Sequence, residues 1–261
     1  MSLGDEHTAA ATGHQEVSMP APTALITGGT SGIGRATAEL LHERGHRVVV
    51  TGRTAESTAA ARRELPDGIV VIRADSRSLA DTDRLAEEVR TRFGSLSALF
   101  LNAGISRSTP IDAVEEAAFD EVFEVNTKGQ FFTLQRLSPL LTDGASVVFT
   151  VGTGVARGIA GGSVTAASRG ALLAMVPSLA LELAPRRIRV NAVSPGAIDT
   201  PIWSKSGAPA AQLARMAEEM AAQIPFGRFG TAREVAEMVG FLCSDGASYV
   251  TGQHIAVGGG L

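Results

Sequence analysis

The stretch that decides the fold is Thr23-Ala24-Leu25-Ile26-Thr27-Gly28-Gly29-Thr30-Ser31-Gly32-Ile33-Gly34. Its first five residues form an apolar run that is typical of a buried strand. Gly28, Gly32 and Gly34 lack a Cβ, so the backbone there can turn sharply and approach a pyrophosphate. The apolar residues after Gly34 recur at helical spacing, and a helix N-terminus favours negative charge. Strand, glycine turn and helix in this order therefore predict a nucleotide site.

The rest of the chain repeats this alternation of apolar strands and amphipathic helices. Besides residues 23–27, strands are predicted at residues 47–51, 69–73, 98–102, 146–150, 187–193 and 254–257. Alternating strands and helices favour a parallel sheet with right-handed crossovers. No internal repeat or linker interrupts residues 22–261. We therefore expect one α/β domain, a Rossmann-like doubly wound parallel sheet of about seven strands flanked by helices.

Composition narrows the function classes. The 261 residues carry 23 basic and 27 acidic side chains, a formal net charge of -4, which lacks the basic excess of nucleic-acid binders. Uncharged runs fall short of the roughly 20 apolar residues that a bilayer span needs, so no membrane is expected. The single cysteine, Cys243, excludes a disulfide framework and a Cys-rich metal site, which favours a cytoplasmic location without a metal. Residues 1–21 have no apolar period and are interpreted as a disordered leader or tag.

Several short motifs carry a resemblance to a known family. Residues 27–34 (TGGTSGIG) fit the TGxxxGxG pattern of the short-chain dehydrogenase/reductase family. The similarity continues, in family order, through Asp75, Asn102-Ala103-Gly104, Asn126, Ser194-Pro195-Gly196 and Thr251-Gly252-Gln253. The resemblance covers residues 22–261 and implies an oxidoreductase that interconverts a carbonyl and an alcohol on a small molecule with a nicotinamide cofactor.

The resemblance also assigns cofactor contacts by position. It implies that Asp75 meets the adenine, that residues 102–104 flank the adenosine ribose, and that residues 195–200 hold the nicotinamide carboxamide. The full set of implied contacts is Gly28, Thr30, Ser31, Gly32, Ile33, Gly34, Arg53, Asp75, Ser76, Asn102, Ala103, Gly104, Arg169, Pro195, Gly196, Ile198 and Thr200.

The end of the second predicted strand favours NADP(H) over NAD(H). Relatives that prefer NAD place a carboxylate there for the ribose 2′-hydroxyl, whereas this chain has Gly52 followed by Arg53. A carboxylate would repel a 2′-phosphate, and a guanidinium can bind it with charge-assisted hydrogen bonds.

The positions of the family's catalytic residues are substituted. The family uses a serine, a tyrosine that supplies or accepts the proton, and a lysine one helical turn later that lowers the pKa of the tyrosine. Here these positions hold Gly152, Thr165 and Arg169, and of the four family positions only Asn126 matches. No shift of the alignment repairs this, because the one tyrosine is Tyr249 and neither Lys128 nor Lys205 lies on this helix.

The substitutions leave three hypotheses open. A threonine hydroxyl is far too weak an acid for the tyrosine's role, whereas an arginine keeps a fixed charge that can grip ribose or stabilise an alkoxide. Lys205 and Arg107 are weak candidate substitutes near the expected substrate pocket. The chain is then an NADP(H)-dependent oxidoreductase with a non-standard proton relay, a catalytically impaired cofactor-binding pseudoenzyme, or a non-redox cyclase or dehydratase that uses the same cleft.

The helices expected over residues 113–141 and 164–184 correspond to the family's subunit-packing surfaces, which implies a homotetramer or a homodimer. The apolar run at residues 171–181 would be costly to expose, so burial in a core or an interface is expected. Pro177 interrupts the helix that bears Arg169, and the lost backbone hydrogen bond is expected to kink this helix. The segment 202–224, expected to cover the substrate, carries no chemical signature that identifies it.

Overall fold

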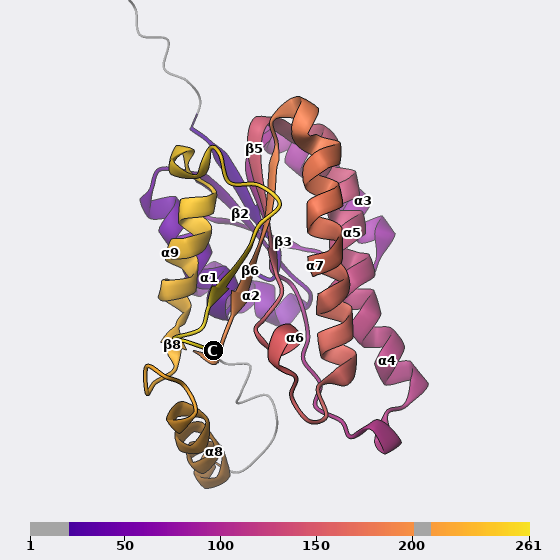
Figure 1. Cartoon of the computed structure of the whole chain (residues 1–261). Helices are drawn as coiled ribbons and strands as arrows, with labels where there is room; N and C mark the ends of the chain where they lie inside the picture. Colours follow the sequence, from indigo (N-terminus) through magenta and orange to yellow (C-terminus); the bar gives the residue numbers. More distant parts are fainter. Residues whose placement is uncertain (1–20, 201–209) are drawn as a thin grey trace, which may run out of the picture.

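A seven-stranded sheet forms the centre of the molecule (Figure 1). The structure is a computed structural model that describes residues 21–200 and 210–261. Every neighbouring pair of strands is parallel, in the order β3-β2-β1-β4-β5-β6-β9. The strands are β1 (Thr23–Ile26), β2 (Arg47–Gly52), β3 (Val70–Arg73), β4 (Leu96–Leu101), β5 (Leu141–Thr150), β6 (Arg189–Pro195) and β9 (His254–Val257). The predicted single α/β domain with its doubly wound sheet is confirmed.

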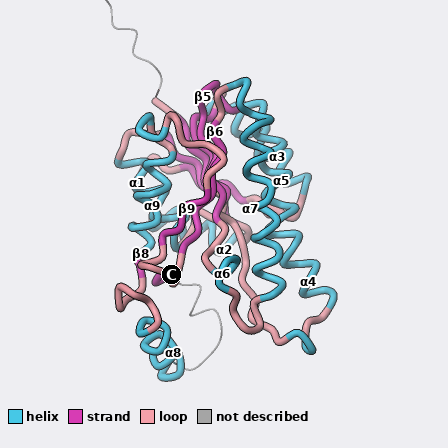
Figure 2. Tube along the Cα trace, in the orientation of Figure 1, coloured by secondary structure: helices cyan, strands magenta, loops and turns pink. Residues whose placement is uncertain are grey.

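Helices cover both faces of this sheet (Figure 2). One face packs against α1 (Gly32–Glu43), α2 (Ala55–Glu64) and α9 (Ala232–Leu242), and the other against α3 (Leu79–Phe93), α5 (Gly129–Leu137) and α7 (Ser163–Leu183). The remaining helices are α4 (Glu116–Phe123), the π-helix η2 (Glu124–Lys128), α6 (Gly154–Arg157), α8 (Ala210–Ala222) and the 3-10 turns η1 (Ile111–Ala113), η3 (Ser138–Leu140), η4 (Ala184–Arg186) and η6 (Asp245–Ala247).

The strands are apolar on both faces because each face has its own core. Leu25 and Leu99 belong to the core beneath α3, α5 and α7, whereas their neighbours Ile26 and Phe100 belong to the core beneath α1, α2 and α9. Successive side chains of a strand point to opposite faces, so a near-continuous apolar run fills both cores. This period explains why the strands could be found from the sequence.

Several local features differ from the sequence expectations, among them strand β5, which begins at Leu141 instead of residue 146. Strand β6 begins at Arg189 instead of residue 187, because η4 precedes it and Arg187 adopts a left-handed conformation with φ 55°. Helix α7 runs from Ser163 to Leu183 with Pro177 inside it, which agrees with the helix expected over residues 164–184, and the kink at Pro177 stays a prediction. A two-stranded sheet of β7 (Ile198–Asp199) and β8 (Gly230–Thr231) was not predicted, because two-residue strands carry no periodic signal.

Helix α7 is long and rich in apolar residues. Together with η4 it gives a 24-residue helical segment, Ser163–Arg186, with mean hydropathy 1.4, which by length and composition alone could cross a membrane. Leu172 and Val176 on its inner face are buried against the sheet, which accounts for part of this apolar character as core packing. Leu181 is 77% exposed, so the rest lies on an outer face.

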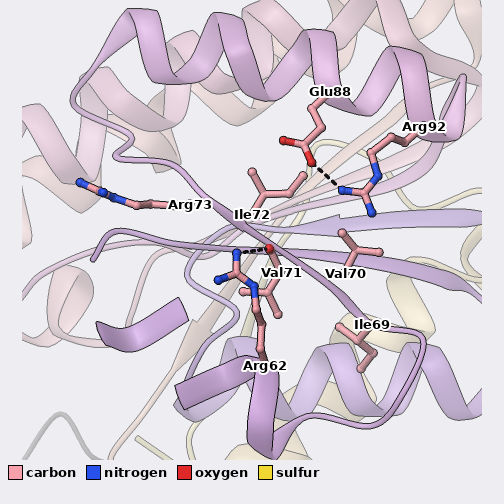
Figure 3. Close-up of a pocket in the computed structure, with 8 residues that line it drawn as sticks. All are labelled: Arg62, Ile69, Val70, Val71, Ile72, Arg73, Glu88 and Arg92. Carbon is pink, nitrogen blue, oxygen red and sulfur yellow. Dashed lines mark hydrogen bonds and ion pairs between the residues drawn. The ribbon is translucent and has the colours of Figure 1, made fainter. Parts of the chain in front are cut away.

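The outer edge of the sheet is hollowed along β3 (Figure 3). Arg62 from α2 covers this edge by donating a 2.9 Å hydrogen bond to the carbonyl oxygen of Val71, and Arg92 pairs with Glu88 at 2.6 Å on the α3 side. Charged side chains at an edge strand discourage pairing with another chain. We interpret this hollow as edge protection, because none of the expected site residues lines it.

Candidate active site

The glycine turn after β1 is tied to the end of β4. Thr27 Oγ1 accepts hydrogen bonds from the backbone N–H groups of Asn102 (2.9 Å) and Ala103 (3.0 Å). The Asn102 side chain returns bonds from Nδ2 to the carbonyl oxygens of Thr27 (3.2 Å) and Gly28 (3.3 Å). Strand order reverses between β1 and β4, and ligands of open α/β sheets bind in the crevice at such a reversal.

Two of the glycines in this turn are required by close packing. Gly28 has φ 63°, and a Cβ there would lie 2.9 Å from the Cα of Ala103. A Cβ at Gly34 would lie 2.4 Å from the carbonyl oxygen of Gly28 and 2.7 Å from Nδ2 of Asn102. The turn can therefore fold tightly against β4 only without side chains at these positions.

The N-terminus of α1 has amide groups that the chain itself leaves without a capping side chain. Its N-cap residue, Ser31, makes no side-chain capping bond, and the first turn holds no acidic residue. Thr54, Ser78 and Thr231 cap α2, α3 and α9 with their hydroxyl oxygens, whereas α4 and α7, like α1, have no side-chain cap. Uncapped N–H groups and the positive end of the helix dipole make this end of α1 fit for an anionic group.

The segment after β6 lies against the glycine turn. A Cβ at Gly32 would be 3.5 Å from the side chain of Thr200, and a Cβ at Gly196 would be 2.7 Å from the Cα of Gly258. Ile198 is held in β7, where it pairs with Gly230 of β8. Pro195 ends β6, whose partner is the edge strand β9. The described part of this segment thus borders the crevice.

Asp75 is held by an arginine beside it in the sequence. Its carboxylate accepts two bonds from Nε of Arg77 (both 3.1 Å) and one from Nη2 (2.7 Å), and these bonds lower the pKa of the Asp75 carboxyl group. Arg77 also lies 3.7 Å from Glu121 of α4, which pairs with Arg107. Hydrogen bonding to Arg107 lowers the pKa of Glu121. A chain of alternating charges therefore runs along this side of the crevice, a feature that sequence spacing does not reveal.

Arg53 lies exposed at the end of β2, next to this chain of charges. Within the described residues it makes no ion pair or side-chain hydrogen bond, although its charge contributes to lowering the pKa values of Asp75 and Glu121. A Cβ at the preceding Gly52 would lie 2.6 Å from Cγ2 of Thr30 in the glycine turn. Thr30 therefore fills the space that a carboxylate at position 52 would need.

Thr165, at the tyrosine position, uses its hydroxyl group to fasten a loop. Its Oγ1 donates to the carbonyl oxygen of Arg107 (3.0 Å) and accepts from the N–H of Arg107 (3.1 Å). The hydroxyl hydrogen is thereby engaged with the backbone of the loop that follows β4. Thr165 thus stabilises the loop, and it offers no acidic proton.

Asn126, the one matching family residue, lies in the π-helix η2 between α4 and α5. It is fully buried, with Oδ1 accepting from Ile105 N–H (2.8 Å) and Nδ2 donating to Ile105 O (2.9 Å) and Ser168 Oγ (3.0 Å). A π-helix widens the turn locally and often marks a functional site. Asn126 therefore joins the β4 loop to α7 at the point where the helix is irregular.

Gly152, at the serine position, has a backbone conformation that disfavours side chains. Its φ is 116°, and its N–H donates to the hydroxyl of Ser194 at 3.2 Å. L-residues rarely adopt this region and are strained there. A glycine at this position is consistent with the local backbone.

Arg169, at the lysine position, is the most unusual side chain in the site. It is 9% exposed, its Nη1 donates to the carbonyl oxygen of Thr150 at 2.7 Å, and Nη2 lies over Gly104, where a Cβ would be only 1.6 Å away. No carboxylate of the described residues forms an ion pair with it. Desolvation by burial lowers the pKa of Arg169 to about 10, so the guanidinium stays charged at neutral pH.

Arg189 shows what a compensated buried arginine looks like in the same protein. It is 8% exposed, and it donates to two carbonyl oxygens at the end of α9, those of Leu242 (2.6 Å) and Ser244 (3.3 Å). Asp245 and Cys243 partly oppose the lowering of its pKa by desolvation. Arg169 has one carbonyl and no such opposing charge.

The structure places the predicted residues at or after the carboxyl ends of β1 to β6, with Arg53 after β2 and Asp75 after β3, and on the helices η2 and α7. Sequence reasoning did not foresee that Thr27 Oγ1 ties the glycine turn to β4, that the Thr150 carbonyl oxygen accepts from Arg169, or that Ser168 binds Asn126, because these contacts join residues distant in sequence. Lys205, a candidate proton donor, lies outside the described residues. Within the described ranges, no three His, Cys, Asp or Glu side chains gather as a metal site.

The uncompensated charge of Arg169 leads to a stability prediction. A pKa lowered to about 10 means that burial disfavours the charged form of Arg169 by about 3 kcal/mol. The hydrogen bond to Thr150, which a substitution would remove, contributes about 1 kcal/mol of stability. Arg169→Met should therefore raise the free energy of unfolding of the ligand-free protein by about 2 kcal/mol, measured by urea unfolding.

Arg189→Met is the matched control for this experiment. It removes two carbonyl partners from a buried arginine and should lower the free energy of unfolding by about 1–3 kcal/mol. Equal destabilisation by the two substitutions would contradict the assignment of Arg169 as an uncompensated charge.

Comparison with known proteins gives one family. Residues 28–261 match the family described as enoyl-(acyl carrier protein) reductase. The 3-oxoacyl-[acyl-carrier-protein] reductase FabG of Thermotoga maritima is 38% identical over 249 residues, 91% of this chain and 96% of that protein. A short-chain dehydrogenase/reductase from Brucella melitensis has a TM-score of 0.85 at 35% identity, with 92% of this chain and 96% of that chain covered.

A second solved structure from Brucella melitensis, a 3-ketoacyl-(acyl-carrier-protein) reductase complexed with NADH, has a TM-score of 0.83 at 30% identity, covering 92% of this chain and 97% of that one. The family resemblance found in the sequence is therefore confirmed over nearly the whole fold. The chain belongs to the short-chain dehydrogenase/reductase family of oxidoreductases.

Proposed function

We propose that this protein is an NADP(H)-dependent oxidoreductase that interconverts a carbonyl and an alcohol on a small molecule, with a non-standard route for the proton. The observation that carries the proposal is the uncapped N-terminus of α1, which follows a glycine turn stitched to the end of β4. The named activities of the relatives, reductases of 3-oxoacyl groups, agree with this reaction class.

The residues present fit a nicotinamide dinucleotide. The amide groups of Ser31 to Gly34 would hold its phosphates, because that helix end is uncapped and lacks a nearby carboxylate. Asn102 to Gly104 would border the adenosine ribose, and Pro195 to Thr200 the nicotinamide end. When bound, the cofactor would supply or accept the hydride. Asp75 would approach the adenine only together with Arg77, which holds its carboxylate.

The end of β2 supports NADP(H) over NAD(H). Arg53 is exposed and without an ion pair among the described residues, and Gly52 has no room for a carboxylate because Thr30 lies against it. A guanidinium without a partner can bind a 2′-phosphate, which carries charge that a ribose hydroxyl lacks. The NADH complex of the Brucella reductase belongs to that protein and leaves this preference to be measured.

Arg53→Ala should separate the two cofactors. Losing charge-assisted hydrogen bonds to the 2′-phosphate should weaken NADPH binding by about 10- to 100-fold and leave NADH binding within about twofold. Fluorescence titration of both dinucleotides measures this, with Arg73→Ala, an exposed arginine on the β3 edge, as the control. Equal loss for both dinucleotides would contradict the NADP(H) preference.

The proton must take a route other than a tyrosine hydroxyl. Thr165 engages its hydroxyl hydrogen with Arg107 O, and Asn126 uses its amide for Ile105 and Ser168. Arg169 can stabilise an alkoxide but does not release its proton at neutral pH. We propose that water or the substrate itself exchanges the proton while Arg169 stabilises the negative oxygen.

A second candidate, a cofactor-binding pseudoenzyme, is favoured by the same observation on Thr165. A hydroxyl that accepts and donates within the backbone of a loop has a structural purpose, so its presence does not require turnover. General acid catalysis contributes about 10²–10⁴ in rate, and its absence could leave cofactor binding as the retained property. The two candidates differ in whether a carbonyl is reduced at the expense of bound cofactor.

Restoring the family's proton donor tests the alignment and the relay together. Thr165→Tyr combined with Arg169→Lys should raise the rate of carbonyl reduction by NADPH about 100-fold or more. The rate is measured from the loss of nicotinamide absorbance. Gly152 is left unchanged, since a side chain at φ 116° would be strained. The matched control is Thr165→Phe with Arg169→Lys, which lacks only the phenol hydroxyl.

If the tyrosine variant binds NADPH and reduces carbonyls no faster than its phenylalanine control, positions 165 and 169 do not correspond to the family's catalytic pair. If the wild type already reduces carbonyls as fast as an active tyrosine variant, another group of this chain supplies the proton, and the pseudoenzyme candidate is excluded.

The outer face of α4, α5 and α7 supports self-association, and we propose a homodimer or homotetramer through it. Phe119 is 42% exposed, Leu181 is 77% exposed, and an apolar hollow lies between Phe123, Phe131, Phe132 and Met175. A second copy would cover these side chains by the same surface on both subunits. The single cysteine, Cys243, supports a cytoplasmic location.

Phe132→Glu should reduce the molar mass measured by light scattering after size exclusion towards that of one chain, because a charge in an apolar interface costs desolvation. Arg63→Glu on α2, which lies on the other face of the sheet, is the control and should leave the mass unchanged. An unchanged mass for Phe132→Glu would exclude this face as the interface.

A further inference from the structure

We infer that Arg169 is a receptor for a carboxylate group of the substrate, so that the preferred substrates are oxo acids or hydroxy acids. The inference rests on the proposed function for the carbonyl or alcohol group, whereas binding of the carboxylate depends on Arg169 alone. Arg169 occupies a position at which the family resemblance implies a lysine that works with a tyrosine. The structure gives this arginine a different setting.

Arg169 has no counter-charge among the described residues. Arg169 is 9% exposed, and the described residues form no ion pair with it. The carboxylates of Asp75 and Glu121 pair with other arginines, Asp75 with Arg77 at 2.7 Å and Glu121 with Arg107. A buried charge without a partner is costly, and an anion that binds beside it removes that cost. The charge is present before any reaction, so its partner should be an anion in the ground state.

The second step is the number of free donors. A guanidinium has five N–H donors in a planar fork, and in the described residues one bond is made, from Nη1 to Thr150 O at 2.7 Å. Arg189, equally buried, is instead held by two backbone carbonyls. The planar fork matches the two oxygens of a carboxylate, which a lysine ammonium does not.

The third step is location. Nη2 lies over the Cα of Gly104, and Oδ1 of Asn126 borders the same space, so the guanidinium lies between the carboxyl ends of β4 and β5. Gly104 is exposed, and a side chain there would displace the guanidinium. Ligands of this architecture bind outside the carboxyl ends of the strands. Arg169 therefore lies at the end of the sheet where we expect the substrate to meet the nicotinamide.

A ribose hydroxyl of the cofactor is the competing partner for Arg169. It can accept a hydrogen bond, but it is neutral and would leave the buried charge uncompensated. The phosphates of the cofactor have their own donors at the N-terminus of α1. The charge of Arg169 thus favours an anion from the substrate over a hydroxyl from the cofactor.

The test compares acetoacetate with its neutral ester, methyl acetoacetate, by isothermal titration calorimetry on the free protein and on the protein loaded with NADP⁺. The oxidised cofactor prevents hydride transfer during the titration. Wild type should bind the acid at least about tenfold more tightly than the ester, from charge-assisted bonds to the carboxylate. Arg169→Gln should abolish that preference, Arg169→Lys should retain part of it, and Arg73→Gln, on the β3 edge, should retain all of it.

Equal binding of acid and ester by wild type, which requires no variant, would overturn the inference. An acid preference that persists in Arg169→Gln would also overturn the inference. If that variant in addition loses NADP⁺ binding, the arginine binds the ribose of the cofactor instead of the substrate. NADP⁺ and NAD⁺ are titrated into the protein beforehand, so that the proposed function and the carboxylate inference are tested separately. Failure of both dinucleotides to bind contradicts the proposed function, whereas the acid preference is still measured on the free protein.

Discussion

The arrangement of the site depends on the hydrogen bonds that tie the glycine turn to the end of β4. Thr27 Oγ1 accepts from two consecutive amides, and the Asn102 side chain returns bonds to the turn, so the two sides of the strand-order reversal are held at fixed separation. Without this tie, the uncapped N-terminus of α1 would not be held beside the loop that leads to Gly104. The parallel sheet supplies the rigid frame, and its two separate cores explain why that frame tolerates irregular loops at the carboxyl ends.

A second constraint acts around Thr165, Asn126 and Arg169, where two side chains hold a loop and the third carries a buried charge. Thr165 and Asn126 both fasten the loop after β4, one from α7 and the other from the π-helix η2. Arg169, between them, contributes charge where stability alone would favour an apolar side chain. Functional sites commonly retain such locally unfavourable features, because binding or reaction offsets them. Thr165 and Asn126 therefore hold the loop after β4, and Arg169 carries the buried charge.

The fold could be predicted almost completely from the sequence, for a physical reason. Strands buried on both faces leave continuous apolar runs, and the glycine turn leaves a pattern with a strict spacing. What could not be predicted depends on contacts between distant residues. The pairing of Asp75 with Arg77 and of Glu121 with Arg107, the missing partner of Arg169 and the left-handed backbone of Gly152 have no local signature.

The most direct measurement of the central claim is a crystal structure of the wild-type protein with NADP⁺ and acetoacetate. We expect phosphates on the amides of Ser31 to Gly34, the substrate's carboxylate and its reacting oxygen both within reach of the Arg169 guanidinium, and water as the only proton donor near the reacting oxygen. An acidic side chain of this protein within hydrogen-bonding distance of that oxygen, Lys205 included, would contradict the claim that the nucleotide site persists without a resident proton donor.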